Sequence, residues 1–370
     1  MTIRESTRRV LDVAAAAALA GGALVGCAGD GGGTSGAAQP WSTRQQSIQP
    51  SGALNTGPTA PTPAPIPIPE MASLRDRALG LLEQAAEGRD PQLRANAIES
   101  LAVAPEVATS YAQRGLTDPN RGVRFVSAMT IANAKLCSIS HLLEPLLRDD
   151  SASVRAAAIL GLWSCGHRVD PTPLAGMMTS DDPEVRGNAA LVLGELGNPS
   201  AIEVLRNSLG RGMTLVNPMR IRVVELQVAE ALVRLGDSSE IDPIRAALFA
   251  PVEQSEIVVL ACQIVGRLDD QNAAASLVRL IEAPGPEARP VEVRLSAIWA
   301  LANMGLDVGP WIDQVATAMR SPNPMIRSQA AIVAGYARDP SLQPPLVGLL
   351  SDTDPRVQIA AARSLLRREG

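Results

Sequence analysis

The sequence contains few aromatic residues, with two Phe, two Tyr and four Trp among 370 residues. Strands of a β-sandwich favour aromatic and β-branched side chains, whereas a core of Ala, Leu, Val and Ile suits closely packed helices. Because 46% of the residues are hydrophobic, this composition favours an all-helical protein. The chain exceeds the length of an ordinary single domain, so we expect several domains or one architecture that grows by adding units.

Residues that carry catalytic or metal chemistry are also scarce. Two His and four Cys are too few for a multi-metal or haem site, and Lys135 is the sole candidate for Schiff-base chemistry. The sequence has no Gly-x-Ser-x-Gly, phosphate-loop, His-Glu-x-x-His or Cys-x-x-Cys-His motif. The net charge of −5 argues against a protein that neutralises nucleic-acid phosphates. We therefore predict no catalytic residue, cofactor, metal, nucleic acid or small-molecule substrate.

The first 27 residues have the features of a bacterial export signal. A basic start with three Arg residues precedes an uncharged stretch over residues 13–25, which is too short to cross a bilayer as a helix. Leu24-Val25-Gly26-Cys27 then resembles the bacterial lipobox, which implies acylation of Cys27 and a lipid-anchored protein facing the periplasm. Ala28 follows in place of the Asp that marks inner-membrane retention in some bacteria, and this favours the outer membrane.

Residues 28–70 are rich in Gly, Ser and Pro and contain nothing that could bury a core. Alternating Pro residues over 58–69 enforce extended polyproline II geometry. We expect a disordered tether, of which residues 40–69 would span on the order of 90 Å between the anchor and a folded domain.

One pattern then recurs to the end of the chain, an aliphatic residue usually followed by Arg. Its nine copies begin at Leu93, Val123, Val154, Val185, Val224, Ile257, Val293, Ile326 and Val357. The steps between them, of 30, 31, 31, 39, 33, 36, 33 and 31 residues, are typical of a solenoid of helix pairs. Six copies have an N-cap residue shortly before the aliphatic residue, namely Asp90, Asn120, Ser151, Asp182, Asn323 and Asp354. We therefore expect a helix at each copy.

This pattern resembles the HEAT-repeat family, including the HEAT-like repeats named after phycobilisome lyases. The best copy is Asp182-Pro-Glu-Val-Arg186-Gly-Asn-Ala189-Ala-Leu-Val-Leu193. The resemblance implies about nine pairs of antiparallel helices over residues 71–370, in which an Asp before each second helix pairs with an Arg of the neighbouring repeat. The candidates for that Asp are Asp118, Asp149 and Asp352, whereas the Arg is replaced at Glu225, Val258 and Gln358. We therefore expect an ion-pair ladder that is interrupted in the middle of the stack.

Four side chains that bind zinc in other proteins lie within 31 residues, namely Cys137, His141, Cys165 and His167. They would suffice for a tetrahedral Cys₂His₂ site, but neither pair has the usual Cys–Cys spacing. A Cys137–Cys165 disulfide, which export to an oxidising compartment permits, and unpaired residues are the alternatives. The sequence leaves all three open and favours unpaired residues.

Two steps are longer than the others, and departures from a solenoid period usually map to loops. They accommodate residues 210–218 and 283–290. The candidate partner-binding residues in the first loop are Met213, Leu215 and Val216. If they are exposed they would suit a protein contact, and the alternative is a longer turn between helices. Trp163 and Trp299 lie on second helices, as binding anchors or as core residues.

These features predict a signal peptide and lipobox over 1–27, a disordered tether over 28–70 and an all-α solenoid over 71–370. We predict a non-catalytic scaffold, anchored by lipid in the cell envelope, that binds another envelope protein. Removal of the signal leaves the chain acidic, which favours neutral or cationic protein surfaces. One alternative, by resemblance, is an enzyme or enzyme subunit like the bilin lyases, and another is a zinc or redox module at Cys137 and Cys165.

Overall fold

The computed structural model describes residues 73–213 and 216–369, so the predicted signal, Cys27 and the whole predicted tether lie outside the described residues. Every regular element within these ranges is an α-helix or a 3₁₀-helix. The prediction of an all-α solenoid is therefore confirmed. None of the helices in these ranges is both long and apolar enough to span a bilayer.

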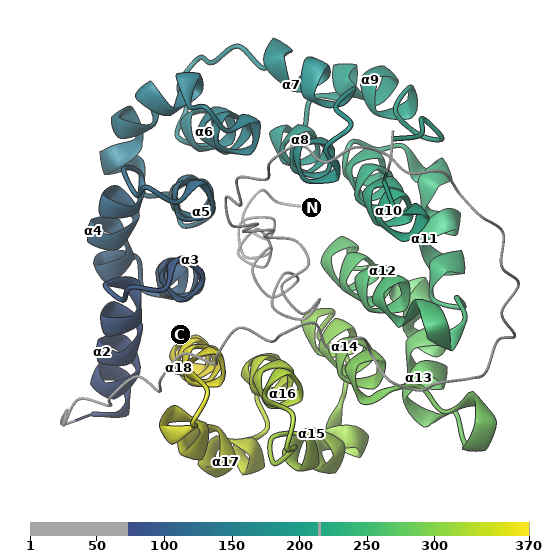
Figure 1. Ribbon diagram of the computed structural model, residues 1–370. Helices are drawn as coiled ribbons and strands as arrows, with labels where there is room; N and C mark the ends of the chain where they lie inside the picture. Colours follow the sequence, from purple (N-terminus) through teal and green to yellow (C-terminus); the bar gives the residue numbers. More distant parts are fainter. Residues whose placement is uncertain (1–72, 214–215, 370) are drawn as a thin grey trace, which may run out of the picture.

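The described helices form nine successive pairs in two layers, with the second helix of each pair on the inside of a ring (Figure 1). The inner helices are α3 (Pro91–Ser100), α5 (Arg121–Asn133), α6 (Ala152–Ser164), α8 (Pro183–Leu196), α10 (Pro218–Arg234), α12 (Ser255–Leu268), α14 (Val291–Asn303), α16 (Pro324–Ala337) and α18 (Pro355–Glu369). The outer elements are α2 (Leu74–Ala86), α4 (Pro105–Gly115), the 3₁₀ segments η4 (Cys137–Leu143) and η5 (Pro145–Arg148), α7 (Thr172–Met177), α9 (Ile202–Arg206), α11 (Ile241–Ala247), α13 (Ala274–Glu282), α15 (Ile312–Ala318) and α17 (Gln343–Gly348).

Short 3₁₀ segments make most of the remaining connections. They are η3 (Leu101–Val103), η6 (Pro199–Ala201), η7 (Ser238–Glu240), η8 (Val252–Gln254), η9 (Gln271–Ala273), η10 (Gly285–Glu287), η11 (Gly309–Trp311), η12 (Pro340–Leu342) and η13 (Leu349–Ser351).

The inner helices begin where the sequence pattern places their N-caps. The Asp90 side chain accepts hydrogen bonds from the backbone N–H groups of Gln92 and Leu93, and Pro91 occupies the first helical position. Because Pro has no N–H to leave unsatisfied there, this start is favourable. The same side-chain cap is present at the other predicted residues, which are Asn120, Ser151, Asp182, Asn323 and Asp354.

Small residues allow adjacent inner helices to pack closely. The Ala four residues after the recurring aliphatic residue is fully buried in α12 and α14, at Ala261 and Ala297. Further along α12, a Cβ added at Gly266 would lie 3.0 Å from the Cα of Ala300 and 2.9 Å from the ring of Trp299. The spacing between these helices therefore depends on glycine at this position.

The ring is closed by its last helix. α18 packs against α2 and α3 of the first pair as well as against its neighbour α16 (Figure 1). Near this seam an ion pair joins Arg75 on α2 to Glu369 on α18, with 3.8 Å between its charged atoms. The sequence pattern predicted a solenoid of helix pairs, and it carried no sign of this closure.

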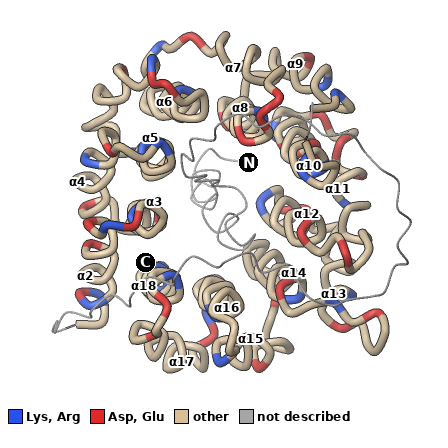
Figure 2. The backbone as a smooth tube through the Cα atoms, viewed as in Figure 1, with Lys and Arg blue, Asp and Glu red and all other residues tan. Residues whose placement is uncertain are grey.

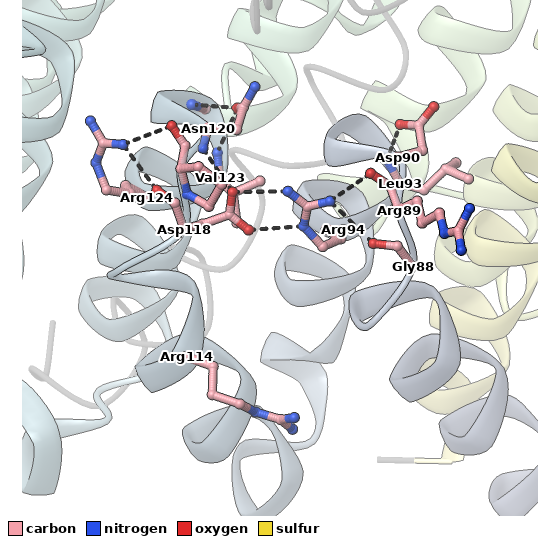
Figure 3. Close-up of polar contacts among 12 residues, drawn as sticks. Gly88, Arg89, Asp90, Leu93, Arg94, Arg114, Asp118, Asn120, Val123 and Arg124 are labelled. Atoms are coloured by element: carbon pink, nitrogen blue, oxygen red, sulfur yellow. Dashed lines mark hydrogen bonds and ion pairs between the residues drawn. The ribbon is translucent and has the colours of Figure 1, made fainter.

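The predicted ladder of ion pairs joins neighbouring repeats (Figure 3). Arg94 donates from Nε and Nη2 to the two carboxylate oxygens of Asp118, at 2.8 and 2.9 Å. Its Nη1 donates to the carbonyl oxygens of Gly88 and Arg89, which precede its own helix. The same two-bond pairing recurs at two further boundaries, Arg124–Asp149 and Arg327–Asp352. The prediction for Asp118, Asp149 and Asp352 is therefore confirmed, and each guanidinium links two repeats.

Other charged pairs join the repeats where Glu225 and Val258 replace the ladder Arg. In the outer layer, Arg206 and Arg245 pair with acidic residues of the following repeats, namely Asp237 and Asp270, at 2.7 and 2.6 Å. In the inner layer, the buried Glu230 on α10 binds Arg267 on α12 at 2.6 Å and Arg234 on its own helix at 2.9 Å. Acidic and basic residues are interspersed around the ring, as these contacts require (Figure 2).

Candidate protein-binding patch

The loop predicted to bind a partner is built into the fold instead. Met213 is only 6% exposed, so the expectation that it is exposed is wrong. Val216 is half-buried and packs against the core, and Leu215 lies outside the described residues. The reason is the buried Arg186, whose Nη1 donates to the carbonyl oxygen of Arg211 at 2.8 Å. That carbonyl takes the place of the ladder Asp, and the long loop therefore serves as a structural contact.

Cys137 and Cys165 form a disulfide between η4 and the end of α6. A zinc site that uses both thiolates is therefore wrong, because each sulfur is bonded to the other. Among the described residues, no group of three or more His, Cys, Asp or Glu side chains has a metal-binding arrangement. His167 instead shares a hydrogen bond with the hydroxyl of Ser140, at 2.9 Å. The expectation of unpaired cysteines is also wrong for this pair.

The two Trp residues considered as anchors differ in environment. Trp299 is fully buried, and its ring meets that of Tyr336 edge-on, with 5.4 Å between ring centroids. Trp163 is 45% exposed at the end of α6. Trp299 is therefore a core residue, whereas Trp163 is available for contact with another molecule.

A second exposed aromatic residue, Phe249, lies on the outer layer and is 56% exposed. It follows the end of α11 between Leu248 and Ala250, which are both buried. Because its neighbours hold the backbone against the core, the Phe249 side chain projects outward. Val252, at the start of η8, is 44% exposed. Two of the three large hydrophobic side chains that are exposed among the described residues therefore lie within four positions of each other.

Phe249 and Val252 border a hollow of about 320 Å³ between the end of α11 and α13. The longer loop over 283–290 forms one wall, because Arg289 donates from Nη1 to the carbonyl oxygen of Ala250 at 2.8 Å. An exposed ion pair between Arg279 and Glu287, at 3.4 Å, lies at the rim. We call this surface the Phe249 patch; its lining residues are Phe249, Pro251, Val252, Ser276, Arg279, Leu280, Ala283, Glu287 and Arg289.

The Phe249 patch has the chemistry of a protein contact. An apolar side chain placed in the hollow would cover Phe249 and Val252, and full burial of one Phe contributes about 1.5–3 kcal/mol. The Arg279–Glu287 pair offers a donor and an acceptor at the edge, which is the polar rim that such interfaces use. The irregular step at 283–290 pointed to this region in the sequence, but nothing there distinguished Phe249 from a core residue.

Comparisons with known proteins agree with the architecture. The family model of HEAT repeats matches residues 139–212 and 312–369. These two stretches of the ring are thus similar to HEAT repeats. A comparison with curated proteins found no match in sequence.

Solved structures with a detectable likeness include two proteins of different size. Human deoxyhypusine hydroxylase, solved with glycerol, is 18% identical, and the alignment covers 72% of this chain and 98% of that one with a TM-score of 0.37. Kap121p bound to Nup53p is 12% identical, with 78% and 41% covered and a TM-score of 0.32. The alignment therefore spans less than half of the karyopherin.

Proposed function

We propose that this protein is a non-catalytic scaffold that binds another protein of the cell envelope through the Phe249 patch. The anchor of the contact is an exposed aliphatic or aromatic side chain of the partner, which enters the hollow between α11 and α13. The observation that carries the proposal is the exposure of Phe249, 56% of its surface, beside Val252 and an apolar hollow. Aromatic side chains in such positions commonly carry most of the energy of an interface.

The contacts of the Phe249 backbone support this role. Both chain neighbours of Phe249 are buried, and Arg289 binds the carbonyl oxygen of Ala250, so we expect little ordering when a partner binds. A surface that is already in its bound conformation avoids the entropic cost of immobilising a loop, which commonly offsets much of the gain from contacts.

We further propose that Cys27 carries the lipid that holds the protein at the membrane, with the outer membrane as its place. The Leu24-Val25-Gly26-Cys27 sequence supports this proposal. Labelling of cells with an alkyne analogue of palmitate should mark the wild-type protein and leave the Cys27→Ser variant unmarked. Density fractionation of the envelope then separates outer-membrane from inner-membrane placement.

The binding proposal is tested with a photo-crosslinking residue at position 252 in living cells. We expect one dominant crosslinked partner, and mass spectrometry identifies it. With both proteins purified, Phe249→Ala should weaken binding by at least about ten-fold, because truncation of an aromatic anchor typically costs about 2 kcal/mol or more. Trp163→Ala is the matched control, since it removes another exposed aromatic ring, 45% exposed against 56% for Phe249, elsewhere on the ring of helices.

The two variants also separate binding from folding. Because both side chains are exposed, both proteins should unfold at the wild-type temperature. Equal affinities of the Phe249→Ala and Trp163→Ala variants for the crosslinked partner would refute the patch as the binding site.

A further inference from the structure

The Cys137–Cys165 disulfide lies at the surface of the ring, where another molecule can reach it. Cys137 and its neighbour Ser138 are exposed, and Cys165 is half-buried beside the exposed Gly166. Exposed disulfides are commonly the labile ones that exchange with external thiols, whereas structural disulfides resist reduction. A thiolate therefore has access to the sulfur of Cys137, and its attack there would make Cys165 the sulfur that leaves.

The single lysine of the chain lies close to this disulfide. Lys135 is exposed, and its Nζ donates to the carbonyl oxygen of Ser164, the residue before Cys165, at 3.2 Å. A cation near a cysteine lowers the pKa of its thiol, and a sulfur whose thiol has a lower pKa leaves faster in thiol–disulfide exchange. Lys135 is therefore placed to stabilise the thiolate that forms on Cys165.

The backbone conformation of Lys135 supports a role for its side chain. Its φ is +54°, in the left-handed region that favours glycine. The turns after three other inner helices have glycine in this conformation, at Gly197, Gly236 and Gly305. Residues with a Cβ that are held in this region are often found at functional sites. Lysine therefore occupies a position where glycine would be less strained.

Other contacts would hold the two cysteines together after reduction. The Lys135–Ser164 hydrogen bond joins the same two segments as the disulfide. In addition, Leu143 is fully buried and packs so closely against α6 that a Cβ added at Gly161 would lie 2.5 Å from its Cδ1 atom. Packing of this kind does not depend on the redox state of the cysteines. The disulfide can therefore open and close within a folded ring.

We propose that Cys137 and Cys165 are a redox-active pair that exchanges electrons with a dithiol protein, and that Lys135 stabilises the leaving thiolate. A thiolate of the partner attacks the sulfur of Cys137 and forms a mixed disulfide. The bond between Cys137 and Cys165 breaks, and its electron pair goes to the sulfur of Cys165. The second thiolate of the partner then attacks the partner's own sulfur in the mixed disulfide and releases Cys137.

The complete exchange transfers two electrons and two protons to this chain, which then carries two thiols, and the partner is oxidised to a disulfide. The site is separate from the Phe249 patch and does not depend on the protein partner proposed for it.

The test is the reaction of the native full chain with dithiothreitol, a small dithiol. Alkylation of the thiols and mass spectrometry then follow the peptides that contain Cys137 and Cys165. Cys262 reports on folding, because it is fully buried and burial raises the pKa of its thiol. We expect Cys137 and Cys165 to become labelled while Cys262 stays unlabelled. Labelling of all three at one rate would show that reduction requires unfolding, and it would overturn the proposal.

Glutathione, a monothiol, identifies the sulfur that is attacked, because its reaction pauses at the mixed disulfide. We expect the glutathione adduct on Cys137. An adduct mainly on Cys165 would contradict the proposed direction of attack.

Lys135→Gly tests the contribution of the lysine. Because glycine adopts a φ of +54° readily, this variant should be at least as stable as the wild type. We expect its reduction by dithiothreitol to be at least about three-fold slower, since the thiolate of Cys165 loses a nearby cation. Lys135→Arg, which keeps the charge, should react at nearly the wild-type rate.

Arg338→Gly is the matched control, because Arg338 has the same φ of +54° after α16, in another repeat. This variant should be reduced at the wild-type rate. Equal rates for Lys135→Gly and the wild type, or an equal loss of rate in Arg338→Gly, would refute the role of Lys135.

Discussion

Replacement of Glu230 by Gln should destabilise the ring strongly at neutral pH and only slightly in acid. Glu230 lies between α8 and α12 and is 5% exposed. Arg267 donates to both of its oxygens at 2.8 and 2.6 Å, and Arg234 donates at 2.9 Å. Arg234 also pairs with Glu195 on α8 at 3.3 Å. The substitution therefore leaves two guanidinium groups with less charge to balance them, within a chain of contacts across three repeats.

The magnitude follows from the pKa of Glu230. Burial alone would raise this pKa, but Arg267 and Arg234 outweigh it and lower the pKa from 4.5 to about 2. A shift of this size corresponds to about 3 kcal/mol of stability. Because the pKa is lower in the folded state, this stability is present above pH 4.5 and is lost as the pH falls toward 2. Loss of one partner from a buried ion pair typically costs a similar amount, about 3–5 kcal/mol.

The assay is urea unfolding of the wild type and the Glu230→Gln variant at intervals between pH 7 and pH 2.5. We expect a difference of about 3 kcal/mol at pH 7 that shrinks below pH 4.5, because the side chain of Glu230 takes up a proton there in the unfolded wild type but not yet in the folded protein. Glu225→Gln is the control, because it makes the same change on α10 at a half-buried side chain outside this cluster. A difference that stays constant across the whole pH range, or an equal loss in the control, would refute the role of the charge.

Three further predictions concern other contacts of the ring. Loss of the Cys137–Cys165 disulfide should lower the free energy of unfolding by about 2–4 kcal/mol. This is checked by comparing the wild type with the Cys137→Ser/Cys165→Ser double variant in oxidising buffer. An unchanged unfolding midpoint would show that the bond contributes nothing. Glu99→Gln should stabilise the protein at pH 8 but not at pH 4, because burial raises the pKa of Glu99 to about 7 against the opposing effect of a nearby Arg. A raised carboxyl pKa removes stability as the pH rises from 4.5 to 7. A pH-independent effect on thermal unfolding would contradict this. Gly266→Ala should destabilise by about 1–3 kcal/mol, because its Cβ would lie within 3.0 Å of a neighbouring helix, whereas Gly176→Ala meets no atom within 4 Å and should be neutral or slightly stabilising by the same measurement.

Local patterns in the sequence were sufficient for the repeat and its internal contacts. The aliphatic–Arg doublet, the Ala that follows it and the N-cap residues such as Asp90 act within one helix pair or between neighbours, so their spacing in the chain reflects their spacing in the structure. The ladder partners Asp118, Asp149 and Asp352 were implied by the resemblance to HEAT repeats. The proposed lipid anchor at Cys27 also follows from a contiguous motif, and it stays a prediction.

Contacts between distant segments were decided only by the tertiary structure. Closure of the ring depends on the small rotation from each pair to the next, and no single repeat encodes the sum of nine such rotations. Met213 became a core residue and Phe249 an exposed one because each position depends on which loop folds over which helix. For the same reason, the sequence left the pairing of Cys137 and Cys165 open, since the partner of a side chain is visible only when all of its neighbours are in place.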